Sequence, residues 1–149
     1  LGRLPLLRQV VQESMRLFPP AWLLARQAER DTSLGGVPVR RGTTVLIGVN
    51  QLHRHPAFWS SPDEFMPTRF AAGAPPPGAY VPFGLGPRNC VGMRLGMVEA
   101  MLILAMVTRR YRFEVTPSWR PRIEALITAH PRDALQVHVT QEPHSHACR

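Results

Sequence analysis

The chain has 149 residues, 44% of them hydrophobic, which suits one modest domain with its own core and argues against a disordered segment. No apolar run reaches the roughly 18 residues that a membrane span needs, and the first residues lack the charged-then-apolar order of a signal peptide. The formal charge is +8 and all 18 basic residues are arginine, but there is no basic run with interleaved aromatic residues, so nucleic-acid binding is not expected.

The two cysteines, Cys90 and Cys148, do not form the pattern of a secreted disulfide framework. We therefore expect a cytoplasmic protein in a reducing compartment. A thiol that stays reduced there is available as a metal ligand.

Residues 4–17 are predicted to form a helix, because their apolar side chains recur at near-helical spacing and two prolines at 19–20 stop the pattern. Glu13 and Arg16 are three residues apart and therefore lie on one face of this helix. Such a pair is most often an exposed ion pair worth a few tenths of a kcal/mol, and E-x-x-R alone is a weak motif.

The next segments alternate short strands with turns. Residues 21–26 are predicted to be an extended apolar strand, and glycine turns between β-branched runs favour a hairpin over residues 34–49. His53 and His55 follow without a third ligand in register, so we predict solvated loop histidines rather than a metal site. Residues 71–79 are rich in proline and glycine and are predicted to be an irregular surface segment.

Residues 83–92 form a glycine-punctuated turn with a cysteine near its end. Gly86 and Pro87 exclude a regular element, and an apolar run at residues 93–107 follows, so Cys90 is predicted to lie on a loop that enters a helix. Unpaired N–H groups at a helix N-terminus favour the anionic sulfur, which makes Cys90 a candidate thiolate ligand of a metal. A buried structural cysteine or half of a disulfide is the alternative.

The pattern F-x-x-G-x-R-x-C-x-G in residues 83–92 constrains four positions besides the cysteine. It resembles the haem-binding loop of the cytochrome P450 superfamily. The resemblance implies that Cys90 is the axial thiolate ligand of haem b (iron protoporphyrin IX), pushing electron density that favours O–O cleavage. It further implies that Phe83 covers the proximal haem face and that Arg88 binds a haem propionate. Gly86 and Gly92 would let the backbone approach the porphyrin closely.

The resemblance extends upstream of this loop. The family carries the E-x-x-R pair on a helix and a later arginine in a Phe-x-Pro-x-Arg-Phe turn, which residues 65–70 match. Glu13, Arg16 and Arg69 are therefore expected to form a buried salt-bridge network that serves folding rather than chemistry. Arg26 resembles the second propionate partner.

Two segments correspond by resemblance to walls of the substrate pocket. One follows the first helix, and the other is the tip of a terminal hairpin that we predict from strands at residues 123–127 and 135–139. The candidate substrate contacts are Trp22, Leu23, Leu24, Leu126, Ile127 and Thr128. For the first three, ordinary core packing is the alternative.

Residues 93–111 are predicted to form a second long helix, apolar nearly all round and therefore buried. Gly96 lies where the family often has alanine. The helix ends in Arg109, Arg110 and Arg112, which complement its negative C-terminal pole or, together with Arg94, dock an acidic electron donor. Residues 143–149 are expected to be a frayed tail, in which His144, His146 and Cys148 bind at most stray metal.

The predicted fold class is α+β: the C-terminal part of the mainly α cytochrome P450 fold, with residues 1–142 as one segment of a single catalytic domain. The implied function is a haem-thiolate monooxygenase that uses dioxygen and two electrons to oxidise a small apolar organic substrate. The implied partner is a ferredoxin or a flavoprotein reductase. A haem-thiolate isomerase or lyase is one alternative, and a non-enzymatic remnant without haem is another.

The family's long central helix with an acid/alcohol pair finds no equivalent in this sequence. We therefore expect residues 1–149 to be a fragment that does not hold haem or turn over unaided. Any membrane attachment would then lie in the missing N-terminal part. Without covering layers the second long helix would be exposed, which is an aggregation hazard.

Overall fold

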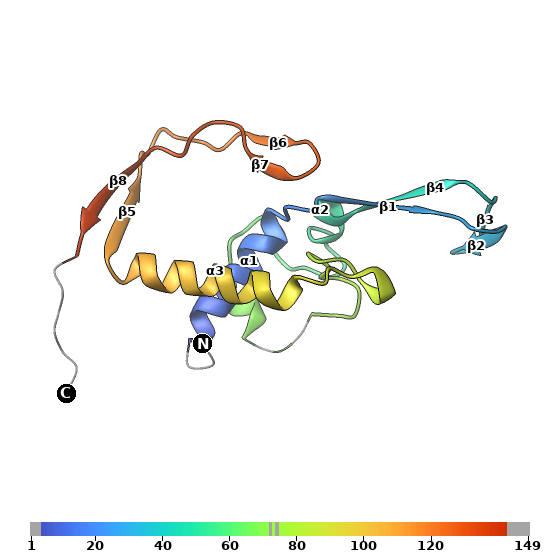
Figure 1. The fold of residues 1–149 in the computed structure, drawn as a ribbon, viewed down its shortest axis with the longest axis horizontal. Helices are drawn as coiled ribbons and strands as arrows, with labels where there is room; N and C mark the ends of the chain where they lie inside the picture. Colours follow the sequence, from blue (N-terminus) through green and yellow to red (C-terminus); the bar gives the residue numbers. More distant parts are fainter. Residues whose placement is uncertain (1–3, 72, 74, 143–149) are drawn as a thin grey trace.

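The computed structural model describes residues 4–71, 73 and 75–142, which form helices and separate antiparallel strand pairs (Figure 1). The predicted α+β mixture is confirmed. In chain order the elements are α1 (Pro5–Leu17), β1 (Leu23–Gln27), β2 (Thr32–Leu34), β3 (Val37–Val39), β4 (Thr44–Gly48), α2 (Val49–Leu52), the 3-10 turns η1 (Pro67–Phe70) and η2 (Gly86–Arg88), α3 (Met93–Thr108), β5 (Tyr111–Val115), β6 (Ile123–Ala125), β7 (Ala129–Pro131) and β8 (Val137–Gln141).

The two long helices pack against each other at the centre, and β-ribbons extend from them to either side (Figure 1). The β1–β4 ribbon reaches out on one side with the β2–β3 hairpin at its end. On the other side β5 and β8 leave the end of α3, and the β6–β7 hairpin arches back towards α1. The Cys loop, residues 81–92, joins the core to the start of α3.

Helix α1 confirms the first predicted helix. Pro5 occupies its first turn, where a missing N–H costs nothing, and the prolines at 19–20 follow its end. Its inward face buries Val11 and Leu17 together with Glu13 and Arg16, so two charged side chains share the face that contacts the core.

The predicted hairpin over residues 34–49 is only partly right. Gly35 and Gly36, with φ of +57° and +84°, close a short hairpin between β2 and β3. Strand β4 pairs instead with β1, from Leu23 opposite Gly48 to Gln27 opposite Thr44. The apolar strand after α1 therefore has its partner in the segment beyond the hairpin, which local turn signals do not reveal.

The predicted pairing of the terminal strands is wrong. Strand β6 pairs with β7 across a tip at residues 126–128, and β8 pairs with β5. The predicted tip residues are nevertheless at the tip of a hairpin.

Helix α3 ends at Thr108, because the alternating aromatic and β-branched residues of β5 favour a strand that can pair with β8.

The core of the described residues is small and lies around α1, α2 and the entry to the Cys loop. Its fully or nearly buried apolar side chains are Val11, Leu17, Val49, Trp59, Ala79, Val81 and Met101. The prediction that the second long helix is buried is wrong for this chain: along α3 only Met101 is buried, while Leu95, Ile103 and Met106 are more than 60% exposed. This leaves much of the apolar surface of α3 exposed.

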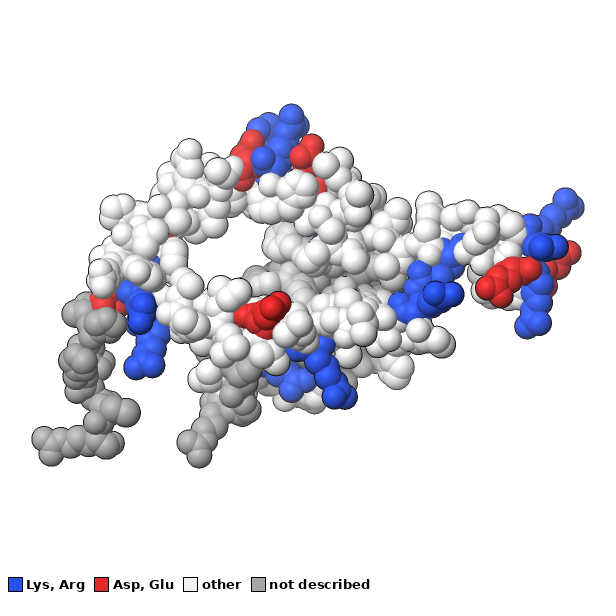
Figure 2. Space-filling model, in the orientation of Figure 1, with Lys and Arg blue, Asp and Glu red and all other residues white. Residues whose placement is uncertain are grey.

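Charged side chains of both signs gather at the β2–β3 end of the molecule, and much of the remaining surface on the face in Figure 2 is uncharged. An opening is visible on that face between the arch of β5–β8 and the two central helices. Among the described residues, no helix is both long enough and apolar enough to cross a membrane.

Candidate functional site

The Cys loop is built from successive tight turns that fix the backbone on both sides of Cys90. The amide of Gly84 donates to the carbonyl of Val81 at 3.0 Å, and the amide of Asn89 donates to the carbonyl of Gly86 at 3.1 Å. The amide of Cys90 donates to the carbonyl of Phe83 at 2.8 Å, which closes the loop. Cys90 is exposed, so its thiol is open to a ligand from outside the described chain.

Three glycines give the loop this path. Gly84 and Gly86 have φ of +80° and +74°, values that residues other than glycine rarely adopt. A Cβ on Gly84 would also lie 3.7 Å from the Cα of Asn89, whereas a Cβ on Gly86 would meet nothing. A Cβ on Gly92 would lie 3.8 Å from the sulfur of Cys90, so this glycine borders the thiol directly.

The other loop residues divide into one packed aromatic and an exposed rim. Phe83 is half-buried, and its ring lies 3.8 Å from the position of a Cβ on Gly96 of α3. Arg88 is exposed on η2, and Leu85 and Val91 are 66% and 103% exposed. The thiol therefore lies among solvent-facing apolar side chains with an arginine two residues away.

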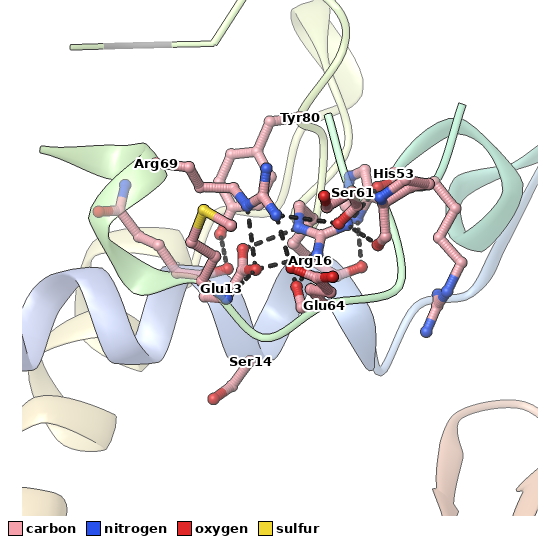
Figure 3. A network of polar contacts seen from close by, with 12 residues as sticks. Glu13, Ser14, Arg16, His53, Ser61, Glu64, Arg69 and Tyr80 are labelled. Carbon is pink, nitrogen blue, oxygen red and sulfur yellow. Dashed lines mark hydrogen bonds and ion pairs between the residues drawn. The ribbon is translucent and has the colours of Figure 1, made fainter. Parts of the chain in front are cut away.

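The structure brings Glu13, Arg16 and Arg69 together in one network (Figure 3). Arg16 binds Glu13 with two nitrogens, Nε to Oε2 at 2.7 Å and Nη2 to Oε1 at 2.9 Å. Arg69 reaches Oε1 of the same carboxylate from η1 at 3.0 Å. Glu13 and Arg16 are completely buried, so the carboxylate is shared by two guanidinium groups away from water.

The two arginines also hold the irregular segment between α2 and η1. Arg16 donates to the carbonyls of His53, Pro62 and Glu64, at 2.8, 2.6 and 3.1 Å. Arg69 donates to the carbonyls of Ser60 and Ser61, at 2.9 and 3.2 Å. A segment without regular hydrogen bonding thus obtains its partners from buried side chains.

The charge of Glu13 is stabilised by its donors. Burial by itself would raise the pKa of this carboxyl, but the hydrogen bonds from Arg16, the amide of Met66 and Arg69 outweigh it and hold the pKa below its ordinary value. Glu13 is therefore a carboxylate at neutral pH.

The expectation that His53 is a solvated loop histidine is wrong, because its ring is completely buried. Its Nε2 accepts the amide N–H of Val81 at 2.8 Å, and its Nδ1 lies 3.2 Å from the carbonyl of Arg16. Burial lowers its pKa to about 4, and the charges of Arg16 and Arg54 act in the same direction, against the backbone hydrogen bonds. His55, in contrast, is exposed.

An aromatic cluster that sequence reasoning missed surrounds the buried arginines. The guanidinium carbons of Arg16 and Arg69 lie 5.2 and 5.9 Å from the ring centre of Trp59, within the range of cation–π attraction. Phe70 and Tyr80 pack on the same tryptophan, and the Tyr80 hydroxyl donates to the carbonyl of Gln12 at 2.9 Å. The available signal in the sequence was the aromatic pair Phe58 and Trp59, which lies between Pro56 and Pro62.

The two segments nominated for a substrate pocket meet in the structure. The indole Nε1 of Trp22 donates to the carbonyl of Leu126 at 2.9 Å, and the amide of Ala129 donates to the carbonyl of Pro20 at 2.8 Å. Leu126 and Ile127 are 62% and 96% exposed, and Thr128 is exposed beside them.

The remaining residues of the upstream segment lie along β1. Leu23 is exposed, and Leu24 is half-buried with its Cδ1 3.9 Å from the position of a Cβ on Gly84 in the Cys loop. Arg26 is exposed, and its Nη1 donates to the neighbouring carbonyl of Ala25. The ribbon therefore touches the Cys loop through Leu24.

A groove of about 700 Å³ runs between α1, α3 and the inner side of the Cys loop. Its walls are largely apolar and include Met15, Met97 and Met101, and Arg8 and Arg94 also line it. Cys90 and Arg88 are not among the residues that line it.

Among residues 4–71, 73 and 75–142, no group of three or more histidine, cysteine or acidic side chains could hold a metal ion. The predicted frayed tail, with His144, His146 and Cys148, lies outside the described residues.

Comparison with known proteins decides the family. The sequence profile described as Cytochrome P450 matches residues 1–136. The chain belongs to the cytochrome P450 family. It is 40% identical over 124 residues to cytochrome P450 714C2 of Oryza sativa subsp. japonica, an alignment that covers 80% of this chain and 24% of the rice protein. It is 36% identical over 141 residues to thromboxane-A synthase of Sus scrofa, which covers 91% of this chain and 26% of the relative.

The solved structures that this fold resembles belong to the same family. A crystal structure of the cytochrome P450DA heme domain superposes with a TM-score of 0.85 at 28% identity, covering 92% of this chain and 31% of that one. This confirms the predicted fold class as part of a cytochrome P450 fold. The chain spans about a quarter to a third of the length of the relatives it matches.

Proposed function

We propose that the intact protein is a haem-thiolate monooxygenase in which the Cys90 thiolate would hold the iron of haem b. The observation that carries this proposal is the Cys loop itself, which presents an exposed thiol on a backbone fixed by the hydrogen bond from the Cys90 amide to Phe83. Haem bound there would supply dioxygen activation with two external electrons. The chain's own residues would bind it, orient it and keep water away from the substrate.

The chemistry of the loop fits a haem. A single thiolate would suit a haem, because the porphyrin itself supplies further ligands to the iron, and the apolar side chains of Leu85 and Val91 would suit the porphyrin face. Gly86 has open space on the side of its missing Cβ. Phe83 packs between the loop and α3 and would support the proximal side.

Two arginines are the proposed propionate partners. Arg88 is exposed on η2, two positions before Cys90 in the sequence. Arg26 is exposed on β1, the ribbon that reaches the Cys loop through Leu24. A guanidinium can bind a carboxylate with two parallel hydrogen bonds, which would fix the rotation of the haem in its plane.

The substrate is proposed to be a small apolar organic molecule bound near Leu23, Leu24 and the β6–β7 tip. The tip presents Leu126 and Ile127 as apolar, largely exposed side chains, and Thr128 adds a hydroxyl. Trp22 contributes by holding the tip through its indole N–H. These residues would determine which C–H bond is oxidised.

The proposed electron donor is a ferredoxin or a flavoprotein reductase. Arg94 near the start of α3 and Arg109 after its end are exposed cations that suit an acidic donor surface. The position of Arg109 at the negative C-terminal end of α3 is also explained by helix capping. The proposed class of electron donor therefore rests on the proposed reaction.

A haem-thiolate isomerase that needs no external electrons is the second candidate. The similarity to proteins named thromboxane-A synthase supports keeping it, since that name describes a product and not an oxygenase. Both candidates depend on Cys90, whereas a non-enzymatic remnant would not.

The deciding experiment measures product formation by the intact protein with and without an electron donor. A monooxygenase requires NADPH and a reductase, and incorporates one atom of labelled dioxygen into its product. Turnover of a hydroperoxide or endoperoxide substrate without any donor would replace this proposal by the isomerase. Absence of haem from the purified intact protein would contradict both.

A further inference from the structure

His53 connects helix α1 to the segment that enters the Cys loop. Its Nε2 accepts a hydrogen bond from the amide N–H of Val81 at 2.8 Å, so this nitrogen carries no proton. The proton must then be on Nδ1, which donates to the carbonyl of Arg16 at 3.2 Å. One neutral tautomer therefore joins two backbone groups that are 65 positions apart in the sequence.

Val81 is the point from which the Cys loop is built. Its amide is bound by His53, and its carbonyl accepts the amide of Gly84, so both of its backbone groups are fixed. Two residues later the carbonyl of Phe83 accepts the amide of Cys90 at 2.8 Å. Hydrogen bonds thus join α1 to Val81 through the imidazole, and the short covalent stretch from Val81 to Phe83 continues the connection to the Cys90 amide.

We propose that His53 is a positioning residue for the haem ligand: it sets the place of the Cys loop relative to the buried Glu13–Arg16–Arg69 network. The inference rests on the proposed role of Cys90. The ring of Tyr80 stacks on His53 with ring centres 5.2 Å apart, which keeps the imidazole plane aligned with the Val81 amide.

The surroundings of His53 favour the neutral ring that this role requires. Arg16 on α1 and Arg54 beside it are cationic, and the Glu13 carboxylate is engaged by Arg16 and Arg69. In an imidazolium Nε2 would also carry a proton and would point it at the amide N–H of Val81. Two buried donors, the Nε2–H group and the Val81 N–H group, would then lack an acceptor.

Three substitutions in the intact protein separate the two hydrogen bonds. His53→Gln offers a side-chain oxygen near the position of Nε2, His53→Asn retains a donor near the position of Nδ1, and His53→Phe retains only the ring. His55→Phe changes the exposed neighbour and is the matched control. Hydrogen exchange of peptides covering residues 81–84 is measured in the haem-free protein, and the thiolate form of the ferrous–CO Soret band in the haem-loaded protein.

We expect exchange at residues 81–84 to become about tenfold faster in His53→Phe and His53→Asn, with a reduced fraction of the thiolate Soret band. His53→Gln should recover most of both signals, which mere filling of the space would not explain. Wild-type exchange in His53→Phe, or equal damage by all three substitutions, would overturn the proposal. A thiolate Soret band that survives Cys90→Ser would instead overturn the proposed function. The hydrogen exchange at residues 81–84 would still test the positioning role of His53.

Discussion

Trp22 and Leu126 are joined by a hydrogen bond from the indole Nε1 to the backbone carbonyl at 2.9 Å, across 104 positions of the sequence. This contact connects the segment that follows α1 with the tip of the β6–β7 hairpin. It gives Trp22 a supporting role in addition to any contact with substrate.

Trp22→Phe is therefore expected to loosen the hairpin tip while keeping most of the aromatic surface. A lost hydrogen bond of about 1 kcal/mol corresponds to roughly five-fold faster hydrogen exchange in residues 123–131. Trp119→Phe, in the segment between β5 and β6, is the control and should leave this exchange unchanged. Unaltered exchange in the Trp22 variant would mean that the hydrogen bond between Ala129 and Pro20 holds the tip by itself.

Removing Arg69 should destabilise the intact protein strongly. Arg69→Ala deprives the buried Glu13 carboxylate of one partner and frees the carbonyls of Ser60 and Ser61. Breaking a buried ion pair on one side typically costs about 3–5 kcal/mol, which urea unfolding would detect as a lower midpoint. Arg122→Ala removes an exposed bidentate pair with Asp133 and should shift the midpoint little. Equal effects of the two substitutions would contradict the importance of burial.

His53 makes stability depend on pH. Its pKa is about 4 in the folded protein against 6.5 for an ordinary histidine, so below pH 6.5 the unfolded chain binds a proton that the folded chain does not. The stabilising contribution is complete above pH 6.5 and is lost as the pH falls towards 4, by roughly 3 kcal/mol in total. The pKa of Glu13 is lowered in the folded protein, so this carboxylate adds its own loss as the pH falls through its ordinary value of 4.5 and below.

This dependence can be measured as the free energy of unfolding at about pH 7.5 and pH 5. The decrease between the two should be smaller in His53→Gln than in the wild type, and unchanged in the exposed His55→Gln. A decrease that is the same in all three proteins would contradict a neutral, buried His53.

The exposed face of α3 should make residues 1–149 associate when they are expressed alone. Ile103 and Met106 are 63% and 65% exposed, and few residues of the helix are covered by the described chain. Size-exclusion chromatography should show oligomers or aggregates, and the double substitution Ile103→Gln, Met106→Gln should reduce them. A soluble wild-type monomer with a stable ferrous–CO thiolate Soret band would contradict this expectation.

Patterns within a few residues were sufficient to predict α1 and the loop before α3, whereas the tip at Leu126 to Thr128 came from the resemblance to a family. Partners distant in sequence were harder, because nothing local shows that β4 pairs with β1 or that β5 pairs with β8. The resemblance to a family supplied Arg69 as the third member of the Glu13 network, which spacing alone could not.

His53 is the residue for which local reasoning failed most clearly. A histidine in a polar, proline-containing segment resembles a surface residue, and its burial results from α1 and Val81 closing over it. Trp59 is similar, since its role depends on two arginines that come from α1 and η1. Both became visible only when the segments that surround them were placed together.

The ligand role of Cys90 is tested most directly by the ferrous–CO absorption spectrum of the intact protein. Wild type and Cys148→Ser, which removes the other thiol of the chain, should both give the Soret band of a thiolate-ligated haem. Cys90→Ser should lose that band completely while keeping the same secondary structure by circular dichroism. A thiolate band that persists in Cys90→Ser, or is absent from wild type with haem bound, would contradict the account.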